Sequence, residues 1–231
     1  EKLYQDDNRI ARPALAAFRA FYLLAVFAPE HLEKLPLDVW TKWSDVILTF
    51  PAHSEKYDTK VHKFLVQKLY EVDSEKFVDA VMRVIFQSNR LNLETLDLID
   101  KIFNLKLQTS LTTLLDNENL PLPSYEALLR FLLDRSVMKA EEIAIRDIDN
   151  AQVTNEVSLN KGLIAAKSLI YFSQDGGWPK IGKVMNDHVE FGERLFLSLS
   201  YRDNLVNILL LKLREEWVAD LFIWLETRFP A

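Results

Sequence analysis

The sequence contains no cysteine among its 231 residues, which excludes disulfide bonds and metal sites built from thiolates. It also lacks any Asn-x-Ser or Asn-x-Thr acceptor for N-linked glycans. A chain without either feature suits a reducing compartment, and we therefore expect a cytoplasmic protein.

Glycine is scarce: the chain has five, and all of them lie between Gly162 and Gly192. The residues before this stretch must therefore turn with proline, asparagine, aspartate and serine. The shift in composition predicts N-terminal helical repeats over residues 1–155 and C-terminal helical repeats over residues 156–231, the second part being continuous with the first.

Long apolar runs are missing as well. The longest extends from Ala20 to Ala28 and is closed by Pro29, far short of the roughly 20 residues that a bilayer requires, so no membrane partner is expected. The formal net charge is −6, which argues against a nucleic-acid partner because phosphate binding needs a concentrated excess of Lys and Arg. The chain begins with Glu1 rather than Met, and we expect it to be part of a longer polypeptide.

Strand-like alternation is nearly absent, and apolar residues recur at helical spacing along most of the chain. One such series is Leu37, Trp40, Trp43, Ile47 and Phe50, and others lie within residues 61–72, 77–85 and 93–103. The spacing of prolines and polar turn residues predicts about a dozen short helices. No tetratricopeptide or ankyrin consensus is present. We predict an all-α protein, an α-solenoid of stacked antiparallel helix pairs that form a HEAT-like right-handed superhelix.

The stretch from Gly177 to Lys183 fits a phosphate-binding loop except at its last position, where Val184 replaces the hydroxyl residue that reaches Mg²⁺. Pro179 also removes one backbone N–H from the segment that would hold phosphate. The alternative is a helix end at Gly176-Gly177, with Trp178 and Pro179 opening the next helix. We favour this second interpretation.

Two further pairs have spacings that occur in catalytic or metal sites. Ser136 and Lys139 have the spacing of a serine–lysine acylation pair but lack its companion motifs, so a helix N-terminus at Ser136 is the simpler expectation. Asp58 and His62 lie one turn apart and could present two metal ligands, but no third ligand is visible. We therefore predict no catalytic residue, no metal ligand and no cofactor-binding residue, and hence no enzyme and no cofactor.

The last segment, from Leu213 to Pro230, reads as an amphipathic helix that stops at a proline. Its apolar residues fall within an arc of roughly 160° on a helical wheel: Trp217, Val218, Leu221, Phe222, Trp224, Leu225 and Phe229. Ala219 and Ile223 point away from this arc, which suggests either a second contact or an exposed patch. The two tryptophans, with Leu221, Leu225 and Phe229, are expected to be buried at the end of a helical stack.

Residues 163–230 resemble the C-terminal helical region of NACHT-type STAND NTPases, the large bacterial and cyanobacterial ones in particular. The resemblance rests on residues 163–169, on Asp175 to Trp178, on Glu190-Phe191-Gly192 and above all on the block from Trp217 to Phe229. Its signature residues are Trp178, Phe191, Gly192, Trp217, Leu221, Trp224, Leu225 and Phe229. The spacing between Asp187 and Glu190 is one residue longer than in the family, and no ATPase core is present.

The resemblance implies a non-catalytic sensor or scaffold module of such an NTPase. It would bind a protein or peptide trigger, or mediate autoinhibition of an upstream ATPase module in the same polypeptide. Two alternatives stay open: a stand-alone helical adaptor for protein–protein interaction, and an all-helical enzyme with an enclosed pocket. The sequence leaves the ligand, its binding face and the oligomeric state undetermined.

Overall fold

A computed structural model describes residues 11–50, 57–87, 93–151, 154–172, 177–200 and 214–229. Within these ranges the chain forms 13 α-helices and one short 3-10 helix, and no strand occurs among them. The predicted all-α class is therefore confirmed. The chain divides into two compact units, Glu1–Leu114 and Leu115–Ala231. The division predicted at residues 155/156 lies within the second unit, in the loop between two of its helices, and a division into two runs of repeats stays a prediction.

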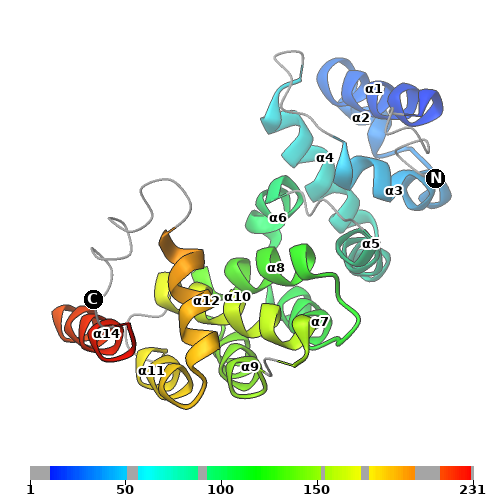
Figure 1. Ribbon diagram of the computed structural model, residues 1–231. Helices are drawn as coiled ribbons and strands as arrows, with labels where there is room; N and C mark the ends of the chain where they lie inside the picture. Colours follow the sequence, from blue (N-terminus) through cyan, green and yellow to red (C-terminus); the bar gives the residue numbers. More distant parts are fainter. Residues whose placement is uncertain are drawn as a thin grey trace. The chain divides into compact units, whose positions relative to one another are not determined.

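The first unit is built from helices (Figure 1), which pack around aromatic side chains. Its elements are α1 (Arg12–Phe27), α2 (Pro29–Leu32), α3 (Leu37–Thr49), α4 (Thr59–Val72), α5 (Ser74–Gln87), α6 (Leu93–Ile99), the 3-10 helix η1 (Asp100–Ile102) and α7 (Leu105–Leu115), which ends at the division between the units. The buried Phe18 of α1 stacks on Phe50, with ring centroids 3.9 Å apart. Trp40 and Phe77 are also fully enclosed.

Asp58 and His62, the pair considered as metal ligands, have separate structural roles. The Asp58 carboxylate caps α4 by accepting a hydrogen bond of 2.8 Å from the backbone N–H of Lys60. His62 is buried, and its Nε2 lies 2.5 Å from the carbonyl oxygen of Ile47. Its ring also meets Phe18 edge-on. These contacts make His62 a satisfied core histidine that joins α4 to α3.

The second unit contains α8 (Leu122–Asp134), α9 (Met138–Asp149), α10 (Glu156–Phe172), α11 (Trp178–Asp187), α12 (Val189–Ser200) and α14 (Glu215–Arg228). Helix α10 is its centre and contacts α8, α9, α11 and α12. Small residues on α10 allow this close packing. A Cβ placed on Gly162 would lie only 2.6 Å from the Cβ of Ala151, at the end of α9.

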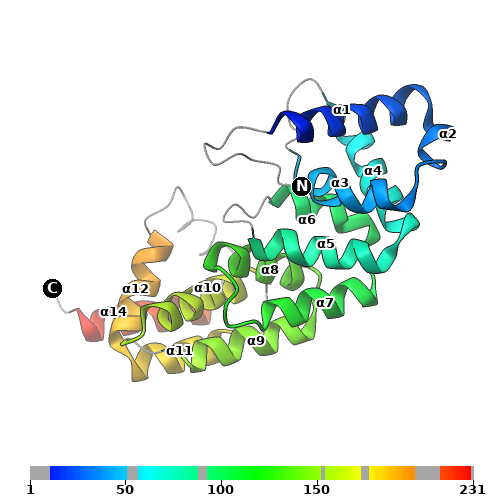
Figure 2. The same cartoon turned by 90° about the vertical axis from the view of Figure 1, so that its right-hand side faces the viewer.

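Several helices in each unit pack against the next helix in sequence and against the one after that, whereas α1 also contacts α4. In the first unit α3 contacts α4 and α5, and α4 contacts α5 and α6. In the second unit α8 contacts α9 and α10, and α9 contacts α10 and α11. Figures 1 and 2 show these neighbours side by side within each unit. Apolar stripes are thus covered by neighbours that are close in sequence.

Helix ends use the residues that the sequence led us to expect. Proline occupies the first turn of α1, α2, α8 and α11, where a missing N–H costs no hydrogen bond. The side chains of Asp73, Asn104 and Asn155 accept hydrogen bonds from backbone N–H groups at the starts of α5, α7 and α10. None of the described helices is long and apolar enough to cross a bilayer.

Ser136 does not begin a helix, contrary to our expectation. It follows α8 with a φ of 54°, in the left-handed region. Its N–H bonds to the carbonyl of Leu133, and the N–H of Val137 bonds to the carbonyl of Leu132. This pair of bonds is a Schellman motif, in which the left-handed position is usually glycine. Helix α9 then starts at Met138.

Because a serine in the left-handed region is strained relative to glycine, Ser136→Gly should stabilise the second unit by about 0.5–1 kcal/mol. Ser136→Ala keeps the Cβ and serves as the control, with no gain expected. Urea unfolding followed by circular dichroism measures both variants. A glycine variant no more stable than the wild-type protein would contradict this account of the turn.

Candidate functional site

The C-terminal helix α14 lies along α11 and forms one wall of a groove with it. The rings of Trp178 and Trp217 stack with centroids 6.1 Å apart, and the Trp224 Nε1–H donates to the Met185 carbonyl at 3.3 Å. Both contacts join residues 39 positions apart (217 − 178 and 224 − 185). A constant offset means that α14 runs parallel to α11, residue for residue.

Trp224 is the anchor of this packing. Its side chain is buried, whereas its neighbours along α14 are half-buried or exposed. The indole lies against Gly192 of α12, where an added Cβ would be 2.4 Å from the indole Cζ2 atom. Phe229 meets the same ring edge-on at 5.8 Å. The absence of a side chain at position 192 is therefore what makes room for the indole.

The predicted apolar arc of α14 is wider than the face that the helix actually buries. Of the five residues expected to be buried, only Trp224 is; Trp217, Leu221 and Leu225 are half-buried, and Phe229 is 47% exposed. Phe222, also on the arc, is 60% exposed. The expected full burial is thus wrong for four residues, because α14 makes its main helix contact with α11 alone among the described helices. Ala219 and Ile223 are exposed, as the position of both off the arc allowed, and Ile223 is 63% exposed.

The signature residues of the resemblance are brought together by this packing. Trp178, Leu221 and Trp224 line the groove between α11 and α14, and Gly192 and Phe229 contact Trp224. Phe191 is fully buried on α12, and its ring faces Gly162 of α10. That these residues are a family signature stays a prediction, and the sequence did not indicate the groove that some of them line.

The groove has a volume of about 490 Å³, and its two walls are formed by α11 and α14. On α11 it is lined by Trp178, Pro179, Gly182, Lys183, Met185 and Asn186, and on α14 by Asp220, Leu221, Ile223, Trp224, Thr227 and Arg228. Gly182 has no atom within 4 Å of the place where a Cβ would stand. The side chains of Lys183 and Asp220 are exposed, and neither forms an ion pair within the described residues.

The stretch that fits a phosphate-binding loop in sequence forms part of this wall. Helix α11 begins at Trp178 with Pro179 in its first turn, as the favoured interpretation predicted. The helix end expected at Gly176-Gly177 is wrong for Gly177, which is the N-cap of α11; Gly176 lies outside the described residues. The Ile181 N–H is already bonded to the Gly177 carbonyl at 2.9 Å. Backbone N–H groups in a helix interior are not available to hold a phosphate.

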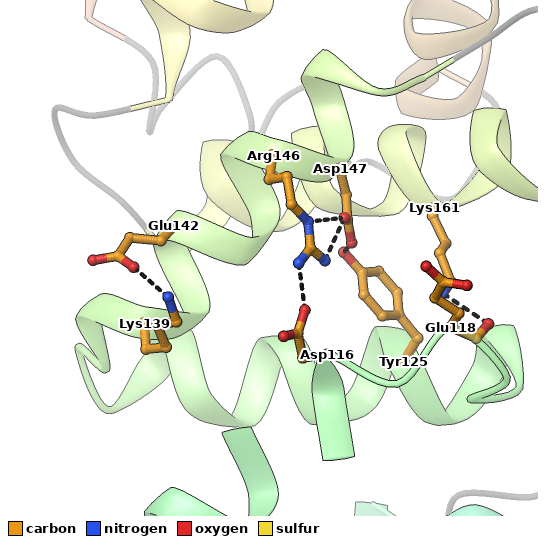
Figure 3. Close-up of polar contacts among 8 residues, drawn as sticks. All are labelled: Asp116, Glu118, Tyr125, Lys139, Glu142, Arg146, Asp147 and Lys161. Atoms are coloured by element: carbon orange, nitrogen blue, oxygen red, sulfur yellow. Dashed lines mark hydrogen bonds and ion pairs between the residues drawn. The ribbon is translucent and has the colours of Figure 1, made fainter. Parts of the chain in front are cut away.

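A second candidate site lies near the C-terminal end of α9, where Arg146 connects two carboxylates (Figure 3). Its Nε and Nη2 donate to Asp147 Oδ1 at 3.0 and 2.8 Å, and its Nη1 donates to Asp116 in the turn after α7. The hydrogen bond to Asp116 is the main reason why the pKa of Arg146 is raised. The guanidinium thus ties the α7–α8 turn to α9.

Tyr125 reaches the same cluster from inside the unit. Its ring is buried, and its hydroxyl donates to Asp147 Oδ2 at 2.8 Å. The Lys161 Nζ lies 5.5 Å from the centre of the Tyr125 ring and donates to the Glu118 carbonyl oxygen at 3.1 Å. Figure 3 shows these side chains converging from α8, α9, α10 and the turn before α8.

These groups border an open hollow of about 580 Å³, lined by Asp116, Glu118, Arg146, Asp147, Asn150, Asn155, Val157, Ser158 and Lys161. Most of its polar groups bind one another. Asn155, for example, caps α10 through its side chain, and the Ser158 hydroxyl donates to the Asn150 carbonyl. The arrangement is that of a brace between four segments of the unit.

The structure does not form the serine–lysine pair. Lys139 Nζ donates to Glu142 at 2.8 Å on the surface of α9, as Figure 3 shows. This hydrogen bond raises the pKa of Lys139, whereas a lysine that acts as a general base needs a lowered pKa. Ser136 serves the helix end described above.

Sequence reasoning missed the Arg146 cluster because its members are far apart in the chain and follow no motif. Asp116, Tyr125 and Asp147 come from three different segments, and the Tyr125–Asp147 bond spans 22 residues. Only the buried position of Tyr125 on an otherwise apolar helix face carries a signal, since a buried phenol requires a hydrogen-bond partner. A search for related proteins finds no matching family model, no curated protein and no solved structure.

Removing the Tyr125 hydroxyl should destabilise the second unit. Tyr125→Phe deletes a buried hydrogen bond to a carboxylate, and we expect a loss of about 1.5–3 kcal/mol. Urea unfolding at neutral pH measures it. Tyr22→Phe, which removes a bond from an exposed pair in the first unit, is the control and should cost less.

The same pair of proteins should converge at alkaline pH. Burial and the adjacent Asp147 carboxylate raise the pKa of Tyr125 above its ordinary value of 10.0, so above about pH 10 the phenol ionises in the unfolded chain first. The folded state then holds a proton that the unfolded state has lost, and stability falls as pH rises. The advantage of the wild-type protein over Tyr125→Phe should therefore shrink from about pH 9 to about pH 11. A constant difference in the free energy of unfolding would contradict the assignment.

Two glycine substitutions test the anchoring of α14. Gly192→Ala places a methyl group against the Trp224 indole and should weaken the docking of α14 by about 1–3 kcal/mol. Gly182→Ala is the matched control on a neighbouring helix, and it should stabilise α11 by about 0.5–1 kcal/mol because nothing obstructs the methyl group. In dilute solution, Gly192→Ala should increase the quenching of tryptophan emission by acrylamide and lower the free energy of unfolding in denaturant. Gly182→Ala should change both quantities in the opposite direction.

Proposed function

We propose that this chain is a non-catalytic helical-repeat module, the sensor or scaffold part of a NACHT-type STAND NTPase. In this role it binds a protein or peptide trigger, or holds an ATPase module of the same polypeptide inactive. The helices of each unit would continue as stacked antiparallel pairs of a HEAT-like solenoid. The chain itself would supply contact surfaces and no chemistry.

The packing pattern supports the solenoid. In such arrays each helix contacts its successor and the helix after it, because each repeat is covered only by its neighbours. The contacts of α3, α4, α8 and α9 follow this rule. Burial is also local: α10 is enclosed by α8, α9, α11 and α12.

The observation that carries the proposal is the exposure of large apolar residues on α14. This helix is anchored by Trp224, yet Phe222 and Ile223 are 60% and 63% exposed. Adjacent exposed apolar residues of this size on a soluble domain are typical of protein-contact surfaces. The polar hollow, by contrast, has its arginine and tyrosine bound to its own carboxylates.

The proposal is tested on the complete encoded polypeptide. Its coding sequence is expected to specify an ATPase module with an intact phosphate-binding loop ahead of residue 1. Deletion of residues 1–231 from that polypeptide should then raise basal ATP hydrolysis or assembly several-fold, or abolish the response to the trigger.

Two outcomes would overturn this function. A coding sequence without an ATPase module would leave the stand-alone adaptor as the explanation of the exposed α14 face. An ATPase whose basal rate, assembly and activation are all unchanged by the deletion would show that the module neither senses nor restrains it. A point-mutated control that retains residues 1–231 but carries Leu105→Glu, on the surface of α7, should behave like the wild-type protein.

A further inference from the structure

The groove between α11 and α14 contains a glycine that the packing of this chain does not explain. A glycine inside a helix costs about 1 kcal/mol relative to alanine. At Gly162, Gly177 and Gly192 an added Cβ would come within 2.8 Å of a neighbouring atom, so glycine is required there. At Gly182, in the middle of α11, the same Cβ would meet nothing within 4 Å.

An apolar side chain stands across the groove from this glycine. Ile223 lines the α14 wall and is 63% exposed. A glycine on one helix permits close approach by a large side chain of another, but Ile223 of the same copy does not fill the space above Gly182, since no atom lies within 4 Å there. The groove therefore has a protruding side chain, Ile223, and a recess at Gly182, and the two do not contact each other.

Three charged side chains line the groove: Arg228, whose Nη2 donates to the Asn186 carbonyl oxygen at 3.5 Å, and Lys183 and Asp220, which carry one exposed charge of each sign. Lys183 follows Gly182 on α11, and Asp220 precedes Ile223 by one turn on α14. The two do not pair with each other, nor with any other residue in the part of the chain that the structure describes. Each wall thus presents an unmatched charge beside its apolar feature, and the two walls are complementary in both respects.

We infer that the occupant of this groove is a second copy of the same chain, related by a two-fold axis. In such an isologous contact each surface feature meets its complement on the partner, and every contact occurs twice. Ile223 of each copy would pack on Gly182 of the other, and Lys183 of each copy would pair with Asp220 of the other. This inference rests on the proposed role of the α14 face as a protein-contact surface.

The parallel course of the two helices makes these contacts geometrically consistent. With an offset of 39 residues, Ile223 is level with Val184 and Asp220 is level with Ile181. Consider a two-fold axis that is perpendicular to both helices and passes at the level of Lys183. This axis places Ile223 of one copy at the level of Gly182 of the other copy. The same axis brings Asp220 of the second copy to within two residues of Lys183 along the helix, about 3 Å at 1.5 Å per residue. A lysine side chain spans that distance.

The first experiment measures self-association of the 231-residue chain by sedimentation velocity at increasing concentration. A monomer–dimer equilibrium is expected, weak because the groove is small. Ile223→Glu should make the chain monomeric across the range, whereas Leu105→Glu should leave the equilibrium unchanged. Leu105 is a matched control because it is also an exposed aliphatic residue, 75% against 63%, on another helix. Circular dichroism verifies that both variants are folded.

The charges give a second test of the contact. Lys183→Glu and Asp220→Lys should each weaken the dimer by about tenfold or more, because each creates two like-charge pairs. The double variant should dimerise again, with both pairs reversed. An equimolar mixture of the two single variants should form a heterodimer, since each of its two charge contacts then joins a carboxylate of one copy to an ammonium group of the other.

Gly182→Ala separates interface effects from folding effects. In dilute solution it should leave the monomer as stable as the wild-type chain or more so, while it weakens the dimer by about tenfold or more. A chain that remains monomeric at about 100 μM, a dimer that Ile223→Glu does not disrupt, or single charge variants that fail to pair when mixed would each overturn the inference. None of these results bears on whether residues 1–231 regulate an upstream ATPase, so the two proposals fail separately.

Discussion

The contact between Trp224 and Gly192 determines the surface of the second unit. The indole fills the space that a side chain at position 192 would occupy, and its N–H satisfies the Met185 carbonyl at the same time. Through this contact α14 is held parallel to α11, and the groove lies between the two helices. Any residue with a Cβ at position 192 would displace the helix that forms one wall of the groove.

Helices α10 and α14 differ in how much of their surface is covered by other helices. Helix α10 is covered by four helices, and its small residues permit close approach on more than one side. Among the described helices, α14 has its main contact with α11 and a contact with Gly192 of α12 through Trp224, and its large apolar residues Phe222 and Ile223 remain exposed.

The sequence predicted the all-α class, the prolines and polar caps at helix starts, and the outward position of Ile223, since these follow from local spacing and local hydrogen bonding. It failed where the outcome depends on which neighbour is present. The apolar arc of α14 includes Phe222, but a helical wheel does not reveal that α11 is its main helix contact. Ser136 fits a helix start in sequence, although it ends the previous helix in a left-handed conformation. The Arg146 cluster joins segments that no motif relates, and it becomes visible only when the chain is folded.

Glycine illustrates how the two levels combine. The sequence shows only that all five glycines lie late in the chain, a pattern that suggests a boundary between an N-terminal and a C-terminal part. The structure gives different causes for the glycines that it describes: close helix contacts account for Gly162 and Gly192, and an N-terminal helix boundary packed on Leu169 accounts for Gly177. No packing contact in the part of the chain that the structure describes requires a glycine at position 182. Since a helix-interior glycine lowers stability, its compensation is expected outside the chain, and the isoleucine across the groove has the size and position to provide it from a second copy.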